Sequence, residues 1–334
     1  MRILVHEFAS GGGLAGRDVP MSLAREGSAM LAALIADLAA IGQHQLITTA
    51  DSRFPLKAPP GVEVVTLSPS SSNRVFDQLI ASVDAVWLIA PESGRTLERL
   101  ALRVEKQGKT LLGSSSLAIC RASDKARLPR ILADHGVSHP ETRVASIKAA
   151  EAIGYPMVVK PGLGAGCEGV WLVRDAGELR QTLDVGHGAT RSGRVLLQRY
   201  VPGMAASVSL LADGRRAIAL TVNSQCMATC RPFSYQGGRT PLEHPLAQRA
   251  AEAAIRACEA LPGLRGYVGV DVVLAQSEPV VIEVNPRLTT AYLGVRSVVD
   301  ENVAAMALDA CAGALPDPPP PRRSVHFTAA GGIS

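Results

Sequence analysis

The pattern of apolar and polar positions is most informative in the last quarter of the chain, where it predicts two short β-strands. Residues 268–274 alternate in character, so that Asp271 faces away from the valines on either side of it. Residues 280–284 form a second strand whose four aliphatic side chains are expected to be buried, although it carries Glu283 and is followed by Asn285. Because an unpaired buried charge is costly, a carboxylate in so apolar a strand indicates a function for it.

Pairing of these strands as neighbours would bring Asp271, Glu283 and Asn285 together. Two carboxylates and an amide oxygen are ligands that suit Mg²⁺, and phosphate oxygens and water would complete its shell. Arg287 follows closely and would lie near an anion held by the metal. The same pattern also fits a hairpin with solvated charges, and the spacing alone does not separate the two interpretations.

The first third of the chain alternates between strand and helix patterns. Strands are expected at residues 2–6, 45–49, 62–66, 85–90 and 110–112, and helices at residues 28–41, 74–82 and 93–107. This order predicts a doubly wound α/β domain of roughly 110 residues. The first strand leads into residues 10–13, a serine and three glycines without G-x-G-x-x-G spacing. We therefore interpret them as a turn beside a substrate pocket rather than as a phosphate site.

The middle of the chain is expected to begin with a helix over residues 124–135, which Ser123 caps and Gly136 ends. Lys125 then lies in the first helical turn, where the helix dipole disfavours a cation. This position favours an anion-binding role for Lys125, and an ordinary surface lysine is the alternative.

A second lysine, Lys160, ends an apolar strand predicted over residues 155–161. It is followed by the flap, our name for the glycine-rich residues 162–169. Backbone N–H groups of such a segment can close over phosphates. The sequence therefore predicts a phosphate-binding flap directly after a lysine.

Gly164, Gly166 and Gly169 match the G-x-G-x-x-G spacing of dinucleotide-binding loops. That fingerprint requires a helix directly after the loop, so that the helix N-terminus meets the pyrophosphate. Residues 170–173 instead have a strand pattern, and Asp175 then caps a helix. A strand, a glycine loop and a strand predict a hairpin lid, and this context excludes a dehydrogenase.

The C-terminal half is expected to consist mainly of strands. We predict a strand at residues 195–201, whose hinge residues 198–201 offer backbone groups to adenine, and a hairpin at 206–212 and 217–223. An irregular loop is expected at 224–242, and helices at 246–260 and 302–312. A polyproline spacer at 316–321 and an edge strand at 324–328 complete the chain.

Composition narrows the class of protein. The 334 residues are 47% hydrophobic and 19% charged with a net charge of +4, which is typical of a soluble globular protein of two or three domains. The charge is too dispersed, and the aromatic content of 4% too low, to favour nucleic-acid binding. No signal peptide or membrane-spanning run is evident, so we expect a cytoplasmic protein. The six cysteines are interpreted as reduced thiols, because Cys226 and Cys230 lack a second pair with zinc-site spacing.

Taken in order, these parts resemble the ATP-grasp superfamily across nearly the whole chain. The resemblance implies an ATP-grasp fold with an N-terminal pre-ATP-grasp domain at residues 1–113, a central lid subdomain at 114–200 and a C-terminal subdomain at 201–334. It also implies ATP with Mg²⁺, or Mn²⁺ in its place, as cofactors. The ATP ligands it implies are Lys125, Lys160, Gly164, Gly166, Gly169, Gln198, Arg199, Tyr200 and Val201, and the metal ligands are Asp271, Glu283 and Asn285.

Two positions depart from the family's pattern. Many relatives have a ribose-binding glutamate where this chain has Ala205, and an arginine where it has Gly269. The second departure suggests that Arg287 or Arg231 supplies the positive charge at the transferring phosphate. Together with Lys160, these two arginines are the catalytic residues that we expect.

Within the superfamily, the chain is most similar to the tyramine–glutamate ligase branch, which makes methanofuran-type one-carbon carriers. The similar segments are HEFASGGG at residues 6–13, FSYQGG at 233–238 and EVNPRLTTAYLG at 283–294. The resemblance implies an ADP-forming ligase that joins the γ-carboxylate of L-glutamate to tyramine or tyrosine through an acyl phosphate. The substrate residues expected on this basis are Glu7, Ser10, Gly11, Gly12, Tyr235, Gly237, Gly238, Arg287, Thr289, Thr290 and Tyr292.

Two alternative functions stay open. An ATP-grasp ligase for another amino-acid pair or peptide has the same parts, and so does a nucleotide-binding regulatory module that has lost catalysis. Phe233, Tyr235 and Tyr292 could line an apolar slot for a phenolic amine or simply pack their loop. We expect small-molecule partners, with neither nucleic acid nor membrane, and the sequence leaves monomer and homodimer open.

Overall fold

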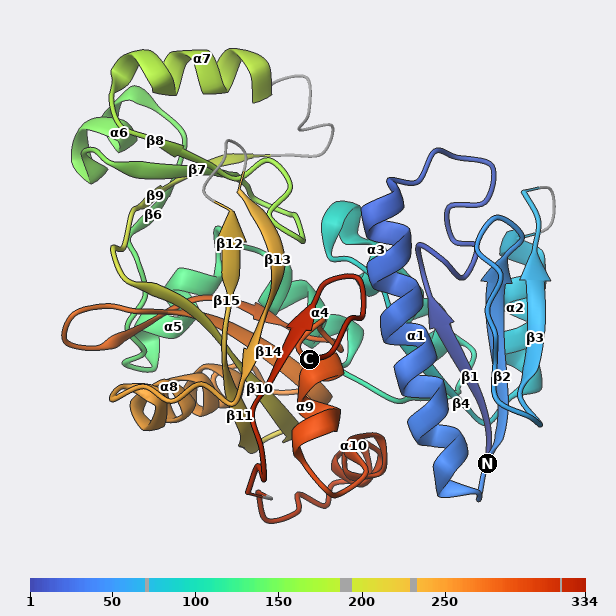
Figure 1. Ribbon diagram of the computed structural model, residues 1–334. Helices are drawn as coiled ribbons and strands as arrows, with labels where there is room; N and C mark the ends of the chain where they lie inside the picture. The colour runs from blue at the N-terminus through green and yellow to red at the C-terminus, as the bar shows by residue number, and fades with distance from the viewer. Residues whose placement is uncertain (70–71, 187–193, 229–232, 319) are drawn as a thin grey trace.

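The N-terminal lobe is built on a parallel sheet with the strand order β3-β2-β1-β4-β5 (Figure 1). The structure, a computed structural model, describes residues 1–69, 72–186, 194–228, 233–318 and 320–334. The elements of this lobe are β1 (Arg2–Glu7), α1 (Met21–Ile41), β2 (Gln45–Asp51), β3 (Glu63–Leu67), α2 (Ser72–Ser82), β4 (Ala85–Ile89), a 3-10 turn η1 (Ser93–Arg95), α3 (Thr96–Lys106) and β5 (Thr110–Leu111). Ile3 and Val5 pack with α1, whereas Leu4 packs with α2 and α3 on the opposite face. The predicted doubly wound α/β arrangement is therefore confirmed.

The first helix begins earlier than its pattern suggested. We expected it to start at residue 28, but α1 starts at Met21 and continues through Gly27. A Cβ atom on Gly27 would come within 2.5 Å of the carboxyl group of Glu7, so the missing side chain allows α1 to approach β1 this closely. Gly42 has a φ of 71° and ends the helix as predicted.

The second lobe, called the lid, is an antiparallel sheet with the order β6-β9-β7-β8. Its elements are β6 (Thr142–Val144), α6 (Ile147–Ile153), β7 (Met157–Pro161), β8 (Trp171–Val173), α7 (Ala176–Gly186) and β9 (Val195–Arg199). The lid has a small core of its own, in which Met157, Val159 and Leu197 pack against the helices. Because β8 pairs antiparallel with β7, the predicted hairpin on either side of the flap is confirmed.

The C-terminal lobe centres on an antiparallel sheet with the order β11-β10-β14-β15. Its main elements are β10 (Met204–Asp213), β11 (Ala217–Ser224), α8 (Ala247–Glu259), β14 (Arg265–Leu274), β15 (Pro279–Asn285), α9 (Tyr292–Val298) and α10 (Val303–Cys311). Valines of β10 and β14 pack on α8 and also on α4 (Ser116–Ser123) and α5 (Leu128–Asp134). These last two helices fall in our proposed central segment, yet they contribute to the C-terminal lobe. In the described part of the chain, no helix is long and apolar enough to cross a membrane.

The helix expected over residues 124–135 is wrong, because two helices occupy this region. Ser123 is the last residue of α4 rather than an N-cap, and α5 begins four residues after Asp124. The side chain of Asp124 accepts hydrogen bonds from the backbone N–H groups of Ala126 and Arg127, at 3.0 and 3.2 Å. An aspartate that binds nearby N–H groups stabilises a turn in competition with a helix, which explains the break.

The irregular loop expected over residues 224–242 contains two strands, β12 (Cys226–Ala228) and β13 (Ser234–Thr240). The predicted edge strand is confirmed as β16 (Val325–Thr328), and it pairs with β13. A Cβ atom on Gly237 would come within 2.1 Å of the carbonyl oxygen of Phe327 on β16, so a glycine is needed at this close approach. β13 pairs both with its neighbour β12 and with the distant β16, so this segment forms two strands of a three-stranded sheet.

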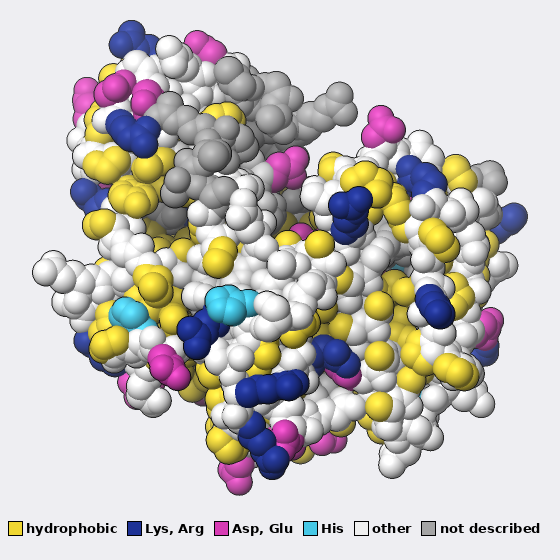
Figure 2. All heavy atoms as spheres, in the orientation of Figure 1, with side chains coloured by type: hydrophobic (Ala, Val, Ile, Leu, Met, Phe, Trp, Pro, Cys, Tyr) yellow, Lys and Arg dark blue, Asp and Glu magenta, His cyan; other side chains and the backbone are white. Residues whose placement is uncertain are grey.

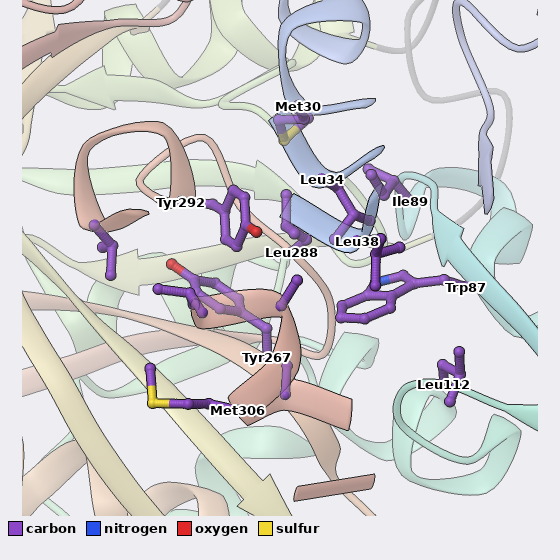
Figure 3. Close-up of a cluster of buried hydrophobic side chains, with 14 of the residues drawn as sticks. Met30, Leu34, Leu38, Trp87, Ile89, Leu112, Tyr267, Leu288, Tyr292 and Met306 are labelled. Atoms are coloured by element: carbon purple, nitrogen blue, oxygen red, sulfur yellow. The ribbon is translucent and has the colours of Figure 1, made fainter. Parts of the chain in front are cut away.

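A continuous apolar core joins the N-terminal and C-terminal lobes, as Figure 3 shows for Leu34, Trp87 and Tyr267 among others. Next to this core, Asp37 on α1 accepts hydrogen bonds from the hydroxyl of Tyr292, at 2.5 Å, and from the guanidinium of Arg296. The two lobes are therefore held by both apolar packing and a partly buried ion pair.

Replacing Asp37 with alanine is expected to destabilise the protein by about 2 to 4 kcal/mol, because it leaves a guanidinium and a buried hydroxyl without their acceptor. The thermal unfolding midpoint measures this effect. Asp309→Ala, an exposed substitution on α10, is the matched control and should leave the midpoint nearly unchanged. Equal midpoints for the two variants would contradict a stabilising role for Asp37.

Candidate active site

A cavity of about 490 Å³ lies where the lid, the C-terminal sheet and α1 meet. The space-filling view shows the surface hollowed between the lid and the N-terminal lobe (Figure 2). Lys160 on β7, Asp271 on β14 and Glu26 on α1 all line this cavity. Each of the three lobes therefore contributes an ionisable side chain to it.

The structure brings the three expected metal ligands together. Asp271 and Glu283 face each other across β14 and β15. The amide of Asn285 donates a hydrogen bond to Oδ2 of Asp271 at 3.0 Å, and Nε2 of Gln225 donates to Oδ1 at 2.8 Å. The register shifts after Asp271, so Ile282 is left out of the pairing and lines the cavity instead of the core, where we had expected it.

Charges within the cavity are strongly coupled. Nζ of Lys125 lies 2.6 Å from Oε2 of Glu283. Burial raises the pKa of the Glu283 carboxyl, but the ammonium groups of Lys125 and Lys160 outweigh burial and lower it overall. Burial and the neighbouring charge of Glu283 raise the pKa of Asp271. Glu283 is thus held as the anion, whereas Asp271 binds a proton more readily unless a cation is present.

Lys125 lies in the turn between α4 and α5, not in a helical turn as we expected. Its backbone N–H donates to the carbonyl oxygen of Gly162 at 3.2 Å, which ties the turn to the base of the flap. Its side chain is buried and points to Glu283. The surface-lysine alternative is therefore wrong, although the dipole argument that favoured an anion-binding role does not apply.

Lys160 is positioned by the lid itself. Its ammonium group donates to Oε1 of Gln198 at 3.0 Å, and Nε2 of Gln198 donates to the hydroxyl of Thr142 at 2.8 Å. Burial, together with the charge of Lys125, lowers the pKa of Lys160 to about 8. Of the hinge residues, Tyr200 and Val201 also line the cavity.

The other hinge and flap residues take several positions. Arg199 lines the cavity while its guanidinium contacts Glu141 at 2.9 Å. Gly164 and Gly166 line the cavity, whereas Gly169 is not part of the wall. The backbone N–H of Ala165 donates to the hydroxyl of Ser93 in the N-terminal lobe at 3.1 Å, so the flap reaches across the cavity.

Arg287 connects the C-terminal and N-terminal lobes at the cavity wall. Its Nε and Nη2 atoms donate to the two carboxylate oxygens of Glu92, at 2.9 and 3.0 Å, and Nη1 donates to the carbonyl oxygen of Leu288. These bonds use three of the five N–H groups of the guanidinium, so two N–H groups remain for other acceptors. The sequence did not identify Glu92, because it lies in a loop 195 positions away.

Three of the expected substrate residues, Tyr235, Thr289 and Thr290, line the cavity with Arg287. Tyr292 does not, since it is fully buried in the core between the lobes (Figure 3). Gly237 and Gly238 pack closely against neighbouring backbone instead of lining the cavity. Tyr292 therefore neither lines an apolar slot nor packs its own loop, whereas Phe233 and Tyr235 line the cavity.

The expected substrate residues at the end of β1 also lie outside the cavity wall. The carboxylate of Glu7 accepts hydrogen bonds from the backbone N–H groups of Ala9 and Ser10 and from the hydroxyl of Ser10. Gly11 and Gly12 pack against Thr49 and Leu67 in the same lobe. These contacts therefore stabilise the turn that follows β1.

Some sequence-based expectations fall outside the described residues, and several residues of the cavity wall were missed, among them Glu26, Gln225 and Met227. Arg231 and Cys230 lie in residues 229–232, outside the described ranges, and Cys226 is exposed. Glu26 lines the cavity but was not identified, because we placed the start of its helix two residues after it.

The donor set fits a magnesium–nucleotide complex. Within the described ranges, no group of three or more His, Cys, Asp or Glu side chains is arranged to hold a metal ion. A pair of carboxylates with one amide is instead suited to Mg²⁺ that takes its remaining ligands from phosphate and water. Two buried lysines beside this pair are suited to the phosphates.

Comparison with protein families and curated proteins gives consistent matches. Residues 122–291 match the model of the ATP-grasp domain, and residues 44–119 match that of the pre ATP-grasp 3 domain. A tyramine–L-glutamate ligase of Methanocaldococcus fervens is 30% identical over 64% of this chain and 62% of its own length. The carbamoyl phosphate synthase large chain of Thermus thermophilus is 26% identical over 66% of this chain but only 22% of its own length. The chain thus spans less than two thirds of these relatives.

Solved structures resemble the whole chain. A putative ATP-grasp superfamily protein from Archaeoglobus fulgidus has a TM-score of 0.74 at 26% identity and covers 98% of this chain and 92% of its own. An L-amino acid ligase from Bacillus licheniformis has a TM-score of 0.72 at 15% identity, covering 98% of this chain and 79% of its own. The second match shows the fold alone.

Proposed function

Because the chain belongs to the ATP-grasp family, we propose that it is an ADP-forming ligase that uses MgATP to join a carboxylate to an amine. Several of the similar proteins are ligases by name. The observation that carries the proposal is that one cavity gathers two buried lysines and the group formed by Asp271, Glu283 and Asn285.

The chemistry requires an activated carboxylate. ATP supplies the phosphoryl group and Mg²⁺ neutralises charge on it. The carboxylate oxygen takes the γ-phosphoryl group, ADP leaves, and the amine nitrogen then displaces phosphate from the acyl phosphate. Positioning and charge neutralisation supply most of the barrier reduction in such a transfer.

Each group in the cavity has a role in this scheme. Lys125 and Lys160 bind phosphate oxygens, and Asp271, Glu283 and Asn285 would hold Mg²⁺. Arg287 offers its two remaining N–H groups to the transferring phosphate or to a substrate carboxylate. The flap excludes water, which matters because an acyl phosphate hydrolyses when water reaches it.

We propose L-glutamate as the carboxylate donor, through its γ-carboxylate, and tyramine or tyrosine as the amine, in a methanofuran-type pathway. The similarity to a tyramine–L-glutamate ligase supports this pair. Met227, Phe233 and Tyr235 also line the cavity, and Met227 pairs with Tyr235 across β12 and β13, which supports a site for a phenolic ring.

The test incubates the protein with ATP, Mg²⁺ and L-glutamate, with and without tyramine or tyrosine. Mass spectrometry should detect a γ-glutamyl amide, and ADP release should depend on the amine. If neither amine raises ADP release above the rate with glutamate alone, the substrate pair is wrong. A wider screen of amino-acid pairs then tests the alternative that the ligase joins another pair.

Binding of MgATP is expected to weaken as the pH rises above the range in which Lys160 is charged. The pKa of Lys160 is lowered to about 8 in the free protein, mainly by burial. A bound phosphate favours the charged lysine, so the complex keeps the proton that the free protein loses. The dissociation constant should therefore rise about tenfold per pH unit above the free-protein pKa. In calorimetric titrations of Lys160→Arg, which keeps its charge, the dissociation constant should not change with pH. A wild-type dissociation constant that is equally independent of pH would contradict this assignment.

A further inference from the structure

The cavity wall also carries charged and hydroxyl groups that are not part of the metal-binding group. Arg287 and the hydroxyl-bearing residues Tyr235, Thr289 and Thr290 are among them. Glu26, from the second turn of α1, lines the same region from the N-terminal lobe. Figure 1 shows the N-terminal end of α1 directed toward the side of the molecule on which the lid lies.

Glu26 differs in its partners from Glu283, Glu92 and Asp271. Glu283 contacts Lys125, Glu92 contacts Arg287, and both oxygens of Asp271 accept hydrogen bonds from amides. Glu26 accepts a hydrogen bond from the hydroxyl of Thr290. Among the residues that the structure describes, no lysine, arginine or histidine forms an ion pair with it. It is thus a half-buried anion on the cavity wall that has a neutral partner.

The negative charge of Glu26 acts on its neighbours. Burial is the main cause that raises the pKa of Tyr235, and the charges of Asp271 and Glu26 add to it. Burial lowers the pKa of Arg287, but Glu92 and, to a smaller extent, Glu26 raise it overall. The geometry agrees with this, because Thr290, whose hydroxyl donates to Glu26, lies three positions after Arg287, and Glu26, Arg287 and Tyr235 all line the same cavity.

We propose that Glu26 binds the α-ammonium group of an amino-acid substrate whose α-carboxylate is bound by Arg287. A cation and an anion that face one cavity are the complement of an amino-acid zwitterion, and the hydroxyl of Thr290 holds the Glu26 carboxylate in place. This assignment rests on the proposed ligase function and specifies its carboxylate donor as an α-amino acid, not a simple dicarboxylic acid.

A pair of ligands isolates the ammonium group. L-Glutamate and glutarate have the same carbon chain and carboxylates, but glutarate lacks the α-ammonium. Calorimetric titrations of both ligands, with Mg²⁺ and a non-hydrolysable ATP analogue present, measure its contribution without requiring turnover. The wild-type protein should bind glutamate about tenfold or more tightly than glutarate, as expected for a hydrogen bond between charged groups.

The variant Glu26→Gln keeps the shape of the side chain and removes its charge. In this variant the dissociation constants for glutamate and glutarate should differ by no more than about twofold, because a neutral amide lacks the charge-assisted bond to the ammonium group. The affinity of the variant for the ATP analogue should stay within about twofold of the wild-type value, which separates loss of the ammonium site from misfolding. Glu63→Gln, an exposed substitution on β3, is the matched control and should keep the full preference.

Two results would overturn the assignment. One is that Glu26→Gln keeps the wild-type preference for glutamate, and the other is that the wild-type protein does not prefer glutamate to glutarate. Absence of ADP release with every amine would instead refute the ligase proposal and leave the binding preference intact. Failure of this assignment and failure of the proposed function are therefore distinguishable.

Discussion

Asp271→Asn is expected to abolish ADP formation while the protein stays folded. The substitution removes one of the two carboxylates of the metal-binding group, and the charge stabilisation lost is several kcal/mol, or on the order of a thousandfold in rate. The fold should tolerate it, because burial and Glu283 raise the pKa of Asp271 and so make its ionised form unfavourable in the free protein. Asparagine also retains an oxygen that can accept from Gln225 or Asn285.

Three measurements separate these effects. A coupled assay reports ADP release, the thermal unfolding midpoint reports stability, and titration with Mg²⁺ reports metal affinity. Asp309→Asn on α10 is the control for loss of one negative charge at an exposed position. Activity of Asp271→Asn within about threefold of wild type would be incompatible with several kcal/mol of metal-dependent stabilisation.

Glu283→Gln should be equally inactive but less stable than Asp271→Asn. Lys125 is buried, and Nζ lies 2.6 Å from the Glu283 carboxylate, so the glutamine variant leaves a buried ammonium without its counter-ion. A lower unfolding midpoint for Glu283→Gln than for Asp271→Asn would support this difference. Equal midpoints would show that Lys125 finds another partner or loses its proton.

Lys160→Ala is expected to weaken binding of MgATP by about tenfold to a hundredfold and to slow turnover as well. A hydrogen bond between charged groups contributes about 1.5 to 3 kcal/mol, and the ammonium of Lys160 is already held in the cavity by Gln198. The loss should affect both the bound nucleotide and the transition state, because charge on the phosphates persists throughout transfer.

Lys148→Ala provides the matched control for this prediction. Lys148 lies on α6 of the same lid but is exposed, so its loss changes the net charge of the lid equally. Nucleotide titrations and steady-state assays should show wild-type values for this variant. If both lysine variants weaken binding to the same extent, the effect is one of general charge and Lys160 does not contact the phosphates.

Local patterns predicted the parts of the site that lie within one hairpin. Asp271 and Glu283 are on adjacent strands joined by a short turn, so strand alternation was sufficient to place them together. The two strands around the flap were predicted for the same reason. Within these hairpins, the sequence did not reveal the register shift that turns Ile282 toward the cavity, because alternation assumes an uninterrupted ladder.

The turn that carries Lys125 shows the limit of local rules. A serine followed by an aspartate and a lysine is consistent with a helix N-terminus, and it equally fits the end of one helix and an aspartate-stabilised turn. The choice depended on packing of α4 and α5 against the C-terminal sheet. That Lys125 binds the anion of a ligand stays a prediction; the structure shows its ammonium group beside Glu283, and the helix-dipole argument does not apply.

The sequence by itself determined the alternation of strands and helices, the two hairpins and the order in which lysines, flap and carboxylates follow one another. Only the tertiary structure decided that Glu92 binds Arg287, that Glu26 reaches the cavity and that Tyr292 is part of the core. The physical reason is that local hydrophobic periodicity determines which face of an element a side chain takes. Which elements then meet depends on how whole lobes pack, and the 195 positions between Glu92 and Arg287 contain no periodic pattern that encodes their contact.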